Sequence, residues 1–246
     1  MNANAKPVAH KPKPAPAANP GTGKSRAGTG AKKGDAANVS GLVVAGRHGP
    51  RVVGAREREI YVQASRLFVE KGYAATSMSD IAEAVKITKA GLYHFVKGKE
   101  ELLFTIMSFG MDELFDEVVY PARAEPDPEA RLRLIIRNHL TNIGRVSSRS
   151  GNPVTIVADE PSGLGPAKRR IINGRKREYF ELIRDTLSEL QARGDARDDV
   201  DVTVATHCIT GSILWMARWR KPNGKLSLNQ IVDQIIAMQL GGILRR

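Results

Sequence analysis

Apolar side chains recur every three or four residues from residue 56 to the end of the chain, and helix breakers separate the blocks that show this period. In the first block, Ile60, Ala64 and Phe68 fall on one face of a helix, and Leu67 joins them. No stretch alternates between apolar and polar residues for long enough to predict a sheet. The sequence therefore predicts an all-α fold of about nine or ten helices.

Capping residues predict where the first helices begin and end. Gly72 is expected to end the first helix. Ser77, with Asp80 three residues later, has the spacing of a capping box and should open the second helix. Thr88 should cap the third helix, which is expected to run from Lys89 to about residue 95.

Prolines mark the ends of the later helices. The fourth helix should begin at Lys99 and run to about Val119, because Pro121 is expected to stop it. Further helices are expected at about 128–148, 166–193, 199–219 and 227–243, with a short one at 153–160.

The first 55 residues differ in composition from the rest of the chain. They hold six Pro, nine Gly and nine Lys or Arg against a single Asp, so +8 of the formal net charge of +12 lies there. Such a segment buries too little apolar surface to offset the entropy of ordering it. Residues 1–55 are therefore interpreted as a disordered basic tail, either a solvated extension or a source of non-specific attraction to phosphates.

The cysteine content and the hydropathy pattern favour the cytoplasm. Cys208 is the one cysteine, which excludes an intrachain disulfide and argues against a cysteine-based metal cluster. No apolar run has the form of a secretory signal or a membrane span. We expect a cytoplasmic protein without membrane association, metal or cofactor.

The second and third expected helices are short and about three residues apart, as in a helix-turn-helix. In that motif the later of the two helices, here the third expected helix of the chain, enters the major groove of double-stranded DNA. Here that helix carries polar donors and small residues, which suit contact with phosphates and base edges: Thr88, Lys89, Ala90, Gly91, Tyr93 and His94. The alternative is that Tyr93 and His94 pack inside a helical bundle.

The segment from Arg58 to Leu103 resembles the DNA-binding domain of the TetR family almost throughout. The resemblance is carried by Ala64, Leu67-Phe68, Gly72-Tyr73, Thr76-Ser77-Met78, Ile81-Ala82, Leu92-Tyr93-His94 and Lys99-Glu100-Glu101-Leu102. It implies a DNA-binding domain at 56–103 and a helical ligand-binding and dimerisation domain at 104–246.

The resemblance also implies roles for single residues. Thr76 and Ser77, before the second helix, should contact phosphates, and so should Lys99. The third helix should contact bases and phosphates through Thr88, Lys89, Gly91, Tyr93 and His94. For Lys97 and Lys99, a plain solvated charge is the alternative.

Two positions depart from the family pattern. Lys86 stands in the turn where a glycine is common, and should adopt the turn at a modest energetic cost. Val96 stands where an aromatic residue is common, and should still pack in the core.

The last two long helices carry stripes of apolar and small residues. Val204, Cys208, Gly211, Ser212, Trp215 and Trp219 form one stripe, and Ile231, Ile235, Met238 and Gly242 form another. The resemblance implies a homodimer through residues 199–219 and 227–243, with two such helices from each subunit. The alternative is that both stripes pack into the core of their own monomer.

The segment from Gly211 to Ser227 is similar to a TetR branch that controls fatty-acid, sterol or aromatic catabolism and responds to acyl-CoA thioesters. Its Trp-x₃-Trp, Pro-x-Gly and Leu-Ser elements carry this similarity. The candidate ligand-binding residues are Phe104, Met107, Met111, His139, Ile143, Phe180 and Trp215, although a buried histidine is more often a core residue. The basic run 168–177 is either a solvated helix face or a clamp for CoA phosphates.

Three other interpretations remain open. An enzyme is disfavoured, because the chain has no Gly-rich phosphate loop, nucleophile elbow or metal-ligand spacing. A sequence-independent basic nucleic-acid binder would follow from the charged tail. A drug-like hydrophobic effector that controls efflux is an alternative to an acyl-CoA. The favoured interpretation is a ligand-responsive regulator, more often a repressor than an activator, which binds an inverted-repeat operator.

Overall fold

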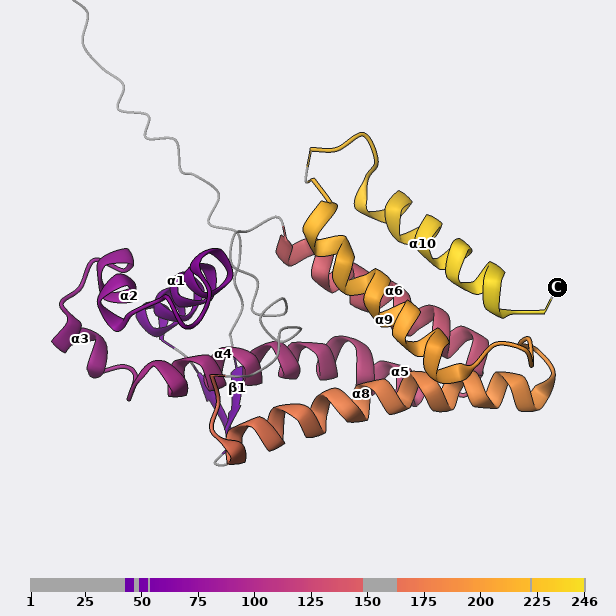
Figure 1. The fold of residues 1–246 in the computed structure, drawn as a ribbon, viewed down its shortest axis with the longest axis horizontal. Helices are drawn as coiled ribbons and strands as arrows, with labels where there is room; N and C mark the ends of the chain where they lie inside the picture. Colours follow the sequence, from indigo (N-terminus) through magenta and orange to yellow (C-terminus); the bar gives the residue numbers. More distant parts are fainter. Residues whose placement is uncertain (1–42, 47–48, 53, 148–162, 222, 246) are drawn as a thin grey trace, which may run out of the picture. The chain divides into compact units, whose positions relative to one another are not determined.

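The computed structural model describes residues 43–46, 49–52, 54–147, 163–221 and 223–245 (Figure 1). Its helices are α1 (Ala55–Lys71), α2 (Met78–Ala84), α3 (Lys89–Tyr93), α4 (Lys99–Leu114), the π-helix η1 (Phe115–Val119), α5 (Tyr120–Ala124), α6 (Pro128–Ser147), α8 (Pro166–Arg193), α9 (Val202–Trp219) and α10 (Leu228–Ile243). The all-α prediction is confirmed. With α4, η1 and α5 counted as one continuous helix, the described residues form eight helices. The expected total of nine or ten included the short helix at 153–160, which lies outside the described residues.

The expected DNA-binding domain, residues 56–103, is called the headpiece. Its capping residues lie where the sequence predicted them. Gly72 ends α1 with a φ of 85°, a conformation that favours glycine. Ser77 and Asp80 form a reciprocal capping box at the start of α2. Thr88 caps α3 by accepting the backbone N–H of Gly91. These local hydrogen bonds determine the length of each short helix.

The prediction that Pro121 ends the fourth helix is wrong. The chain continues through η1 into α5, with Pro121 in the first turn of α5. Proline has no N–H to donate to the carbonyl four residues earlier, which belongs to Glu117. The side-chain amide of Asn138, on α6, donates to that carbonyl at 2.8 Å instead. The wider π turn and this bond from a neighbouring helix let the helix pass the proline.

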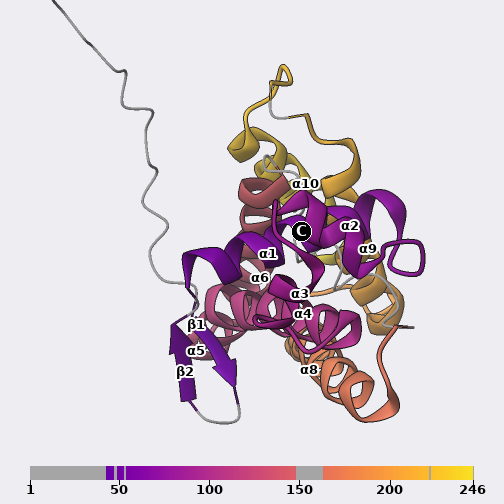
Figure 2. The same cartoon turned by 90° about the vertical axis from the view of Figure 1, so that its left-hand side faces the viewer.

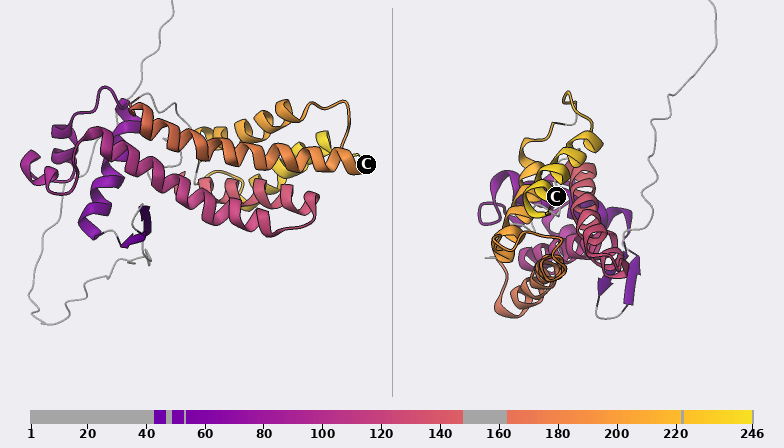
Figure 3. Two further views of the ribbon diagram at one scale, coloured as in Figure 1. Left: turned by 90° about the horizontal axis from the view of Figure 1, so that it is seen from below. Right: turned by 90° about the vertical axis from the view of Figure 1, so that its right-hand side faces the viewer.

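The body is a bundle in which α6 lies against η1, α8, α9 and α10, and α8 also lies against α4 and α9 (Figure 3). Its core is aliphatic, and the fully buried side chains include Leu132, Ile135, Ile136, Leu140 and Ile143, all from one face of α6. In the part of the chain that is described, no helix is long and apolar enough to cross a membrane.

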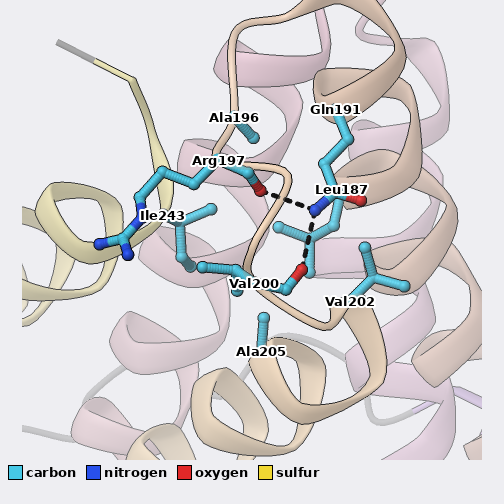
Figure 4. A pocket seen from close by; sticks show the side chains of 8 residues that line it. All are labelled: Leu187, Gln191, Ala196, Arg197, Val200, Val202, Ala205 and Ile243. Carbon is cyan, nitrogen blue, oxygen red and sulfur yellow. Dashed lines mark hydrogen bonds between the residues drawn. The ribbon is translucent and has the colours of Figure 1, made fainter.

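The connection between α8 and α9 is tied to the C-terminal end of α10. Ala196 forms an isolated bridge with Leu244, and the N–H of Arg197 donates to the carbonyl of Ile243 at 2.9 Å. The small recess beside this connection has no room for a water molecule (Figure 4). It is lined by Leu187, Gln191, Ala196, Arg197, Val200, Val202, Ala205 and Ile243. There the amide of Gln191 donates to the carbonyls of Arg197 and Val200, at 2.7 and 2.8 Å.

Two of the predicted segments lie mostly or wholly outside the described residues. Most of the expected disordered tail and the expected short helix at 153–160 lie outside the described residues. Within the expected tail, β1 (Val43–Gly46) pairs with β2 (Gly49–Val52) in an antiparallel hairpin that the sequence did not predict. The period-two pattern is too short there to be recognised as a strand.

Candidate nucleic-acid interface and effector core

In the headpiece, α1 lies against both α2 and α4, and α2 lies against α3 (Figure 2). Leu92 is fully buried and anchors α3 on the core of the headpiece. The other predicted contact residues of this helix lie on its outer side, where Thr88, Lys89, Ala90, Tyr93 and His94 are exposed and Gly91 is half-buried. The alternative in which Tyr93 and His94 pack within the bundle is therefore wrong for this structure.

Gly91 lies close to the side chain that caps α3. A Cβ at this position would lie 3.1 Å from the Thr88 hydroxyl oxygen, which accepts the N–H of Gly91 at 3.0 Å. A side chain at position 91 would therefore crowd the hydroxyl that caps α3. Gly91 thus has a structural reason to be small that the sequence did not reveal.

Thr76 does not present its hydroxyl to solvent, contrary to its expected contact with a phosphate. Its side chain is 1% exposed and donates to the carbonyls of Leu67 and Gly72, at 3.2 and 2.8 Å. A hydroxyl has one hydrogen, and here the hydrogen serves the turn between α1 and α2. Thr76 therefore holds this turn in place.

Ser77 is exposed, and its polar groups are engaged in the capping box. Its backbone N–H donates to the carboxylate of Asp80 at 2.7 Å, and its hydroxyl contacts the same carboxylate. These hydrogen bonds lower the pKa of Asp80 to about 2, so the carboxyl is ionised at the start of α2. The N-terminus of α2 is therefore already occupied by a negative charge from the protein itself.

Lys99 is neither a free cation nor a plain solvated charge. Its ammonium donates to the carbonyls of Tyr73, Ala74 and Thr76, at 2.9, 3.3 and 2.9 Å. It also lies 4.4 Å from the centre of the Tyr73 ring. Lys99 thus joins the first turn of α4 to the turn before α2. Lys97, two residues earlier, is exposed.

The start of α8 rests on the same corner of the headpiece. The carboxylate of Glu100 accepts the backbone N–H of Gly165 at 3.1 Å, and Lys168 reaches Glu101 at 2.8 Å. Gly163 lies directly against the ring of Tyr73, where a Cβ would come within 2.3 Å of a ring carbon. Glu100 and Glu101 belong to α4, so the contact outside α4 is the one between Gly163 and Tyr73.

The candidate effector residues divide between the core and the surface. Met107, Met111, His139 and Ile143 are buried. Two others are half-buried: Phe104 lies beneath the ammonium of Lys168, and Phe180 lies 4.7 Å from the ring of His207.

Trp215 is not a wall of an internal channel in this structure. Its side chain is 61% exposed, so its assignment as a ligand-binding residue is corrected. The sequence could not distinguish the two faces of α9, because both carry apolar residues at helical spacing.

His139 and Tyr179 form a buried polar pair between α6 and α8. The Nδ1 atom of His139 lies 2.7 Å from the hydroxyl of Tyr179, and the two rings meet edge to face. Burial lowers the pKa of His139 to about 4 and raises the pKa of Tyr179. Both side chains are therefore uncharged at neutral pH.

Glu113, on α4, is a titratable residue that the sequence did not single out. Burial, the nearby Glu117 and the nearby Asp112 together raise the pKa of Glu113 to about 7. Asp112 itself forms a salt bridge with Arg175 of α8 at 2.6 Å. Acidic residues on an otherwise apolar helix are the only sequence signal that could have indicated this cluster.

The basic run 168–177 is divided between internal contacts and the surface. Lys168 and Arg175 bind carboxylates of α4, and Arg169 donates to the carbonyl of Leu164 at 2.9 Å. Arg170 and Arg177 are exposed. Neither the solvated face nor the CoA clamp describes the whole run, because Lys168 and Arg175 join α8 to α4.

The stripe predicted on α9 faces solvent. Val204, Trp215 and Trp219 are exposed, as is Cys208. On α10, Met238 is 78% exposed, whereas Ile231 is buried. Part of the α10 stripe therefore packs into the core of the monomer, whereas the α9 stripe does not.

Two family models match the chain. Residues 60–106 match the model described as bacterial regulatory proteins of the tetR family. Residues 125–243 match the model described as the tetracyclin repressor-like C-terminal domain.

Individual proteins with similar sequences or structures span most of the chain. The transcriptional repressor KstR2 of Mycolicibacterium smegmatis is 28% identical over 195 residues, which cover 79% of this chain and 93% of the relative. A crystal structure of AibR in complex with isovaleryl coenzyme A and operator DNA has 36% identity and a TM-score of 0.66, and covers 74% of this chain and 97% of AibR. The structure of KstR2 of Mycobacterium tuberculosis has 25% identity and a TM-score of 0.69, over 79% of this chain and 97% of that one. The chain belongs to the TetR family of bacterial transcriptional regulators and is not an enzyme.

Proposed function

We propose that this protein is a cytoplasmic repressor that binds an inverted-repeat operator as a homodimer and is released by an acyl-CoA thioester. The observation that carries the proposal is the outer face of α3, which combines exposed polar donors with a helix anchored by the buried Leu92. The likeness to AibR, whose structure contains both isovaleryl coenzyme A and operator DNA, supports the choice of effector.

The DNA contacts are assigned to α3. Lys89 and the N-terminus of the helix would contact phosphates, and Tyr93 and His94 would reach phosphates or base edges. Lys97 is the better candidate for the phosphate contact expected of Lys99, because its ammonium is exposed. Thr76 and Lys99 would act indirectly, by holding the turn that orients α2 and α3.

The dimer is assigned to α9 and α10. The exposed Val204, Trp215 and Trp219 would be covered by the same helices of a second copy, in a symmetric four-helix contact. Such a dimer would hold two copies of α3 at the spacing of successive major grooves.

Release would follow from a shift between two states of the dimer. An effector changes DNA affinity only if it binds one state better than the other. α4 begins at the headpiece with Lys99 and continues into the core with Met107 and Met111, so it can transmit a change in the body. The contact of Gly163, just before α8, with the ring of Tyr73 would supply a second route that does not pass through α4.

The test begins with fragmented genomic DNA from the source organism, incubated with the protein at about 0.15 M salt and then sequenced. We expect one inverted repeat to be enriched, and an acyl-CoA from a series between acetyl-CoA and palmitoyl-CoA to release it. A Tyr93→Ala variant, which changes an exposed side chain, should lose the enrichment and keep its thermal stability. Uniform retention of DNA, or an operator complex that resists every acyl-CoA, would contradict the proposal.

A further inference from the structure

One buried polar side chain of the body lacks a partner on one side. His139 is 3% exposed, and its Nδ1 atom is engaged by Tyr179. Its other ring nitrogen, Nε2, has no hydrogen-bond partner within the described part of the chain. Buried polar atoms are nearly always hydrogen-bonded, so an unpartnered atom in the middle of a bundle indicates a ligand or an ordered water.

Tyr179 determines which proton the imidazole carries. The raised pKa of Tyr179 keeps its hydroxyl protonated, and this hydroxyl can donate to Nδ1 of His139. Nε2 then holds the proton of the ring and is a donor. The opposite arrangement would leave both the phenol hydrogen and Nε2 without a partner among the described residues, at a greater cost. The pair therefore offers one donor that no described residue accepts.

The chemistry of this donor restricts what it can bind. The lowered pKa of His139, about 4, keeps the imidazole neutral. A carboxylate or phosphate placed against a neutral donor would lose its hydration without gaining an opposite charge from the pair. A neutral carbonyl oxygen needs only one hydrogen bond and tolerates apolar surroundings.

The buried residues of α6 near His139 are mostly aliphatic, and the exception is Asn142, whose amide donates to the carboxylate of Glu117. Ile143 lies one turn further along the same face of α6 and is fully buried, and Ile136 and Leu140 are also fully buried. A single donor among aliphatic side chains matches a thioester, in which one carbonyl oxygen follows an apolar acyl chain.

We infer that the Nε2–H of His139 donates to the thioester carbonyl oxygen of the effector, and that Tyr179 is a positioning residue that fixes the proton on Nε2. This inference rests on the acyl-CoA effector proposed above, and it adds the atom that recognises the thioester.

The experiment compares thioesters with their thioethers. Each acyl-CoA from acetyl-CoA to palmitoyl-CoA is paired with the S-alkyl-CoA in which a methylene replaces the carbonyl, and both are titrated calorimetrically into the full chain. We expect the best thioester to bind about tenfold more tightly than its thioether, as for one buried hydrogen bond. In the double variant H139F/Y179F, which replaces both polar groups with apolar rings, this ratio should fall to about one.

Three further variants make the result decisive. H139Q keeps an amide donor and should retain part of the preference. Y179F leaves the imidazole proton free to move to Nδ1, and should give a ratio below that of the wild type, even if the double variant fails to fold. T186V removes a buried hydroxyl that bonds only to its own helix, and should keep the full ratio.

The possible failures can be told apart. An unchanged tenfold ratio in H139F/Y179F, or in Y179F if the double variant fails to fold, would overturn the inference and leave the proposed function standing. A wild-type protein that binds thioester and thioether equally would do the same. A wild-type protein that binds no acyl-CoA would overturn both.

Discussion

Lys86 has a backbone conformation that costs conformational free energy, and the sequence indicated this position. It is the only residue other than glycine with a positive φ in the described part of the chain, at 56°. A side chain in this left-handed region costs about 1 kcal/mol relative to glycine. It lies in the turn between α2 and α3, where the family pattern suggested a glycine.

Replacing Lys86 by glycine should therefore stabilise the protein. We expect K86G to raise the free energy of unfolding by about 1 kcal/mol, measured by denaturant titration. The matched control is K86A, which removes the same charge but keeps a Cβ, and it should give no gain. An equal gain in both variants would mean that the charge, not the backbone, sets the cost.

Glu113 should make stability depend on pH. Its folded pKa of about 7 lies above the ordinary value of 4.5, so the folded state binds more protons between these two values. The free energy of unfolding contributed by this group then falls as the pH rises from about 4.5 to about 7, and the loss is complete above that range. Glutamine cannot ionise and should remove the effect.

We expect E113Q to match the wild type near pH 4.5 and to be more stable by about 2 kcal/mol at pH 8. Thermal unfolding across this range measures the difference. E70Q is the control, because Glu70 pairs with Arg66 on an exposed face of α1 and should show little change. A difference between E113Q and wild type that does not vary with pH would contradict the assigned pKa.

At the scale of the helices, the sequence predicted correctly those helix ends that depend on residues close by in the chain. The caps at Ser77 and Thr88 each involve residues within one turn, and both form as expected from their spacing. The course of the chain through Pro121 depends instead on Asn138, which lies on another helix. The sequence could not supply that partner, so the proline was assigned to a helix end.

The candidate site follows the same division. The exposed face of α3 could be predicted because helical spacing alone separates Tyr93 from the buried Leu92. The role of Lys99 could not, because its carbonyl partners lie 23 to 26 residues earlier in the chain. From the sequence alone, a lysine at the start of a helix could equally well bind a phosphate of DNA or the carbonyls of a turn in the protein.

The salt dependence of DNA binding can separate these two roles of Lys99. A lysine that contacts a phosphate contributes about one unit to the slope of log K against log salt. We expect K99M to leave this slope unchanged and to lower the free energy of unfolding by about 1 to 3 kcal/mol, because three carbonyls lose a charged donor.

The matched control is K89M, on the exposed face of α3. It should reduce the slope by about one unit and leave the stability of the protein unchanged. If K99M reduces the slope as K89M does, Lys99 reaches a phosphate in the complex, and its bonds to the turn exist only without DNA.

For the whole molecule, the exposed apolar residues of α9 are the basis of the proposed dimer. Two tryptophans and a valine are exposed on one face of α9, and Met238 is exposed on α10. Large apolar side chains that gather on one exposed face often mark a contact with another protein. The buried aliphatic core between α6, α8 and α9 is complete without these side chains. Their substitution should therefore change the assembly and not the fold.

We expect W215E to convert a dimer into a monomer, measured by sedimentation velocity without DNA, because a carboxylate would be buried at a contact between two copies. Its thermal unfolding should then become independent of protein concentration, whereas that of the wild type should rise with it. V69E is the matched control, since Val69 is a comparably exposed apolar residue on α1, away from α9, and this variant should remain a dimer. Operator affinity should fall steeply in W215E, because a single headpiece makes only half of the contacts. A W215E protein that remains dimeric would place the subunit contact elsewhere and leave the exposed face of α9 without its assigned role.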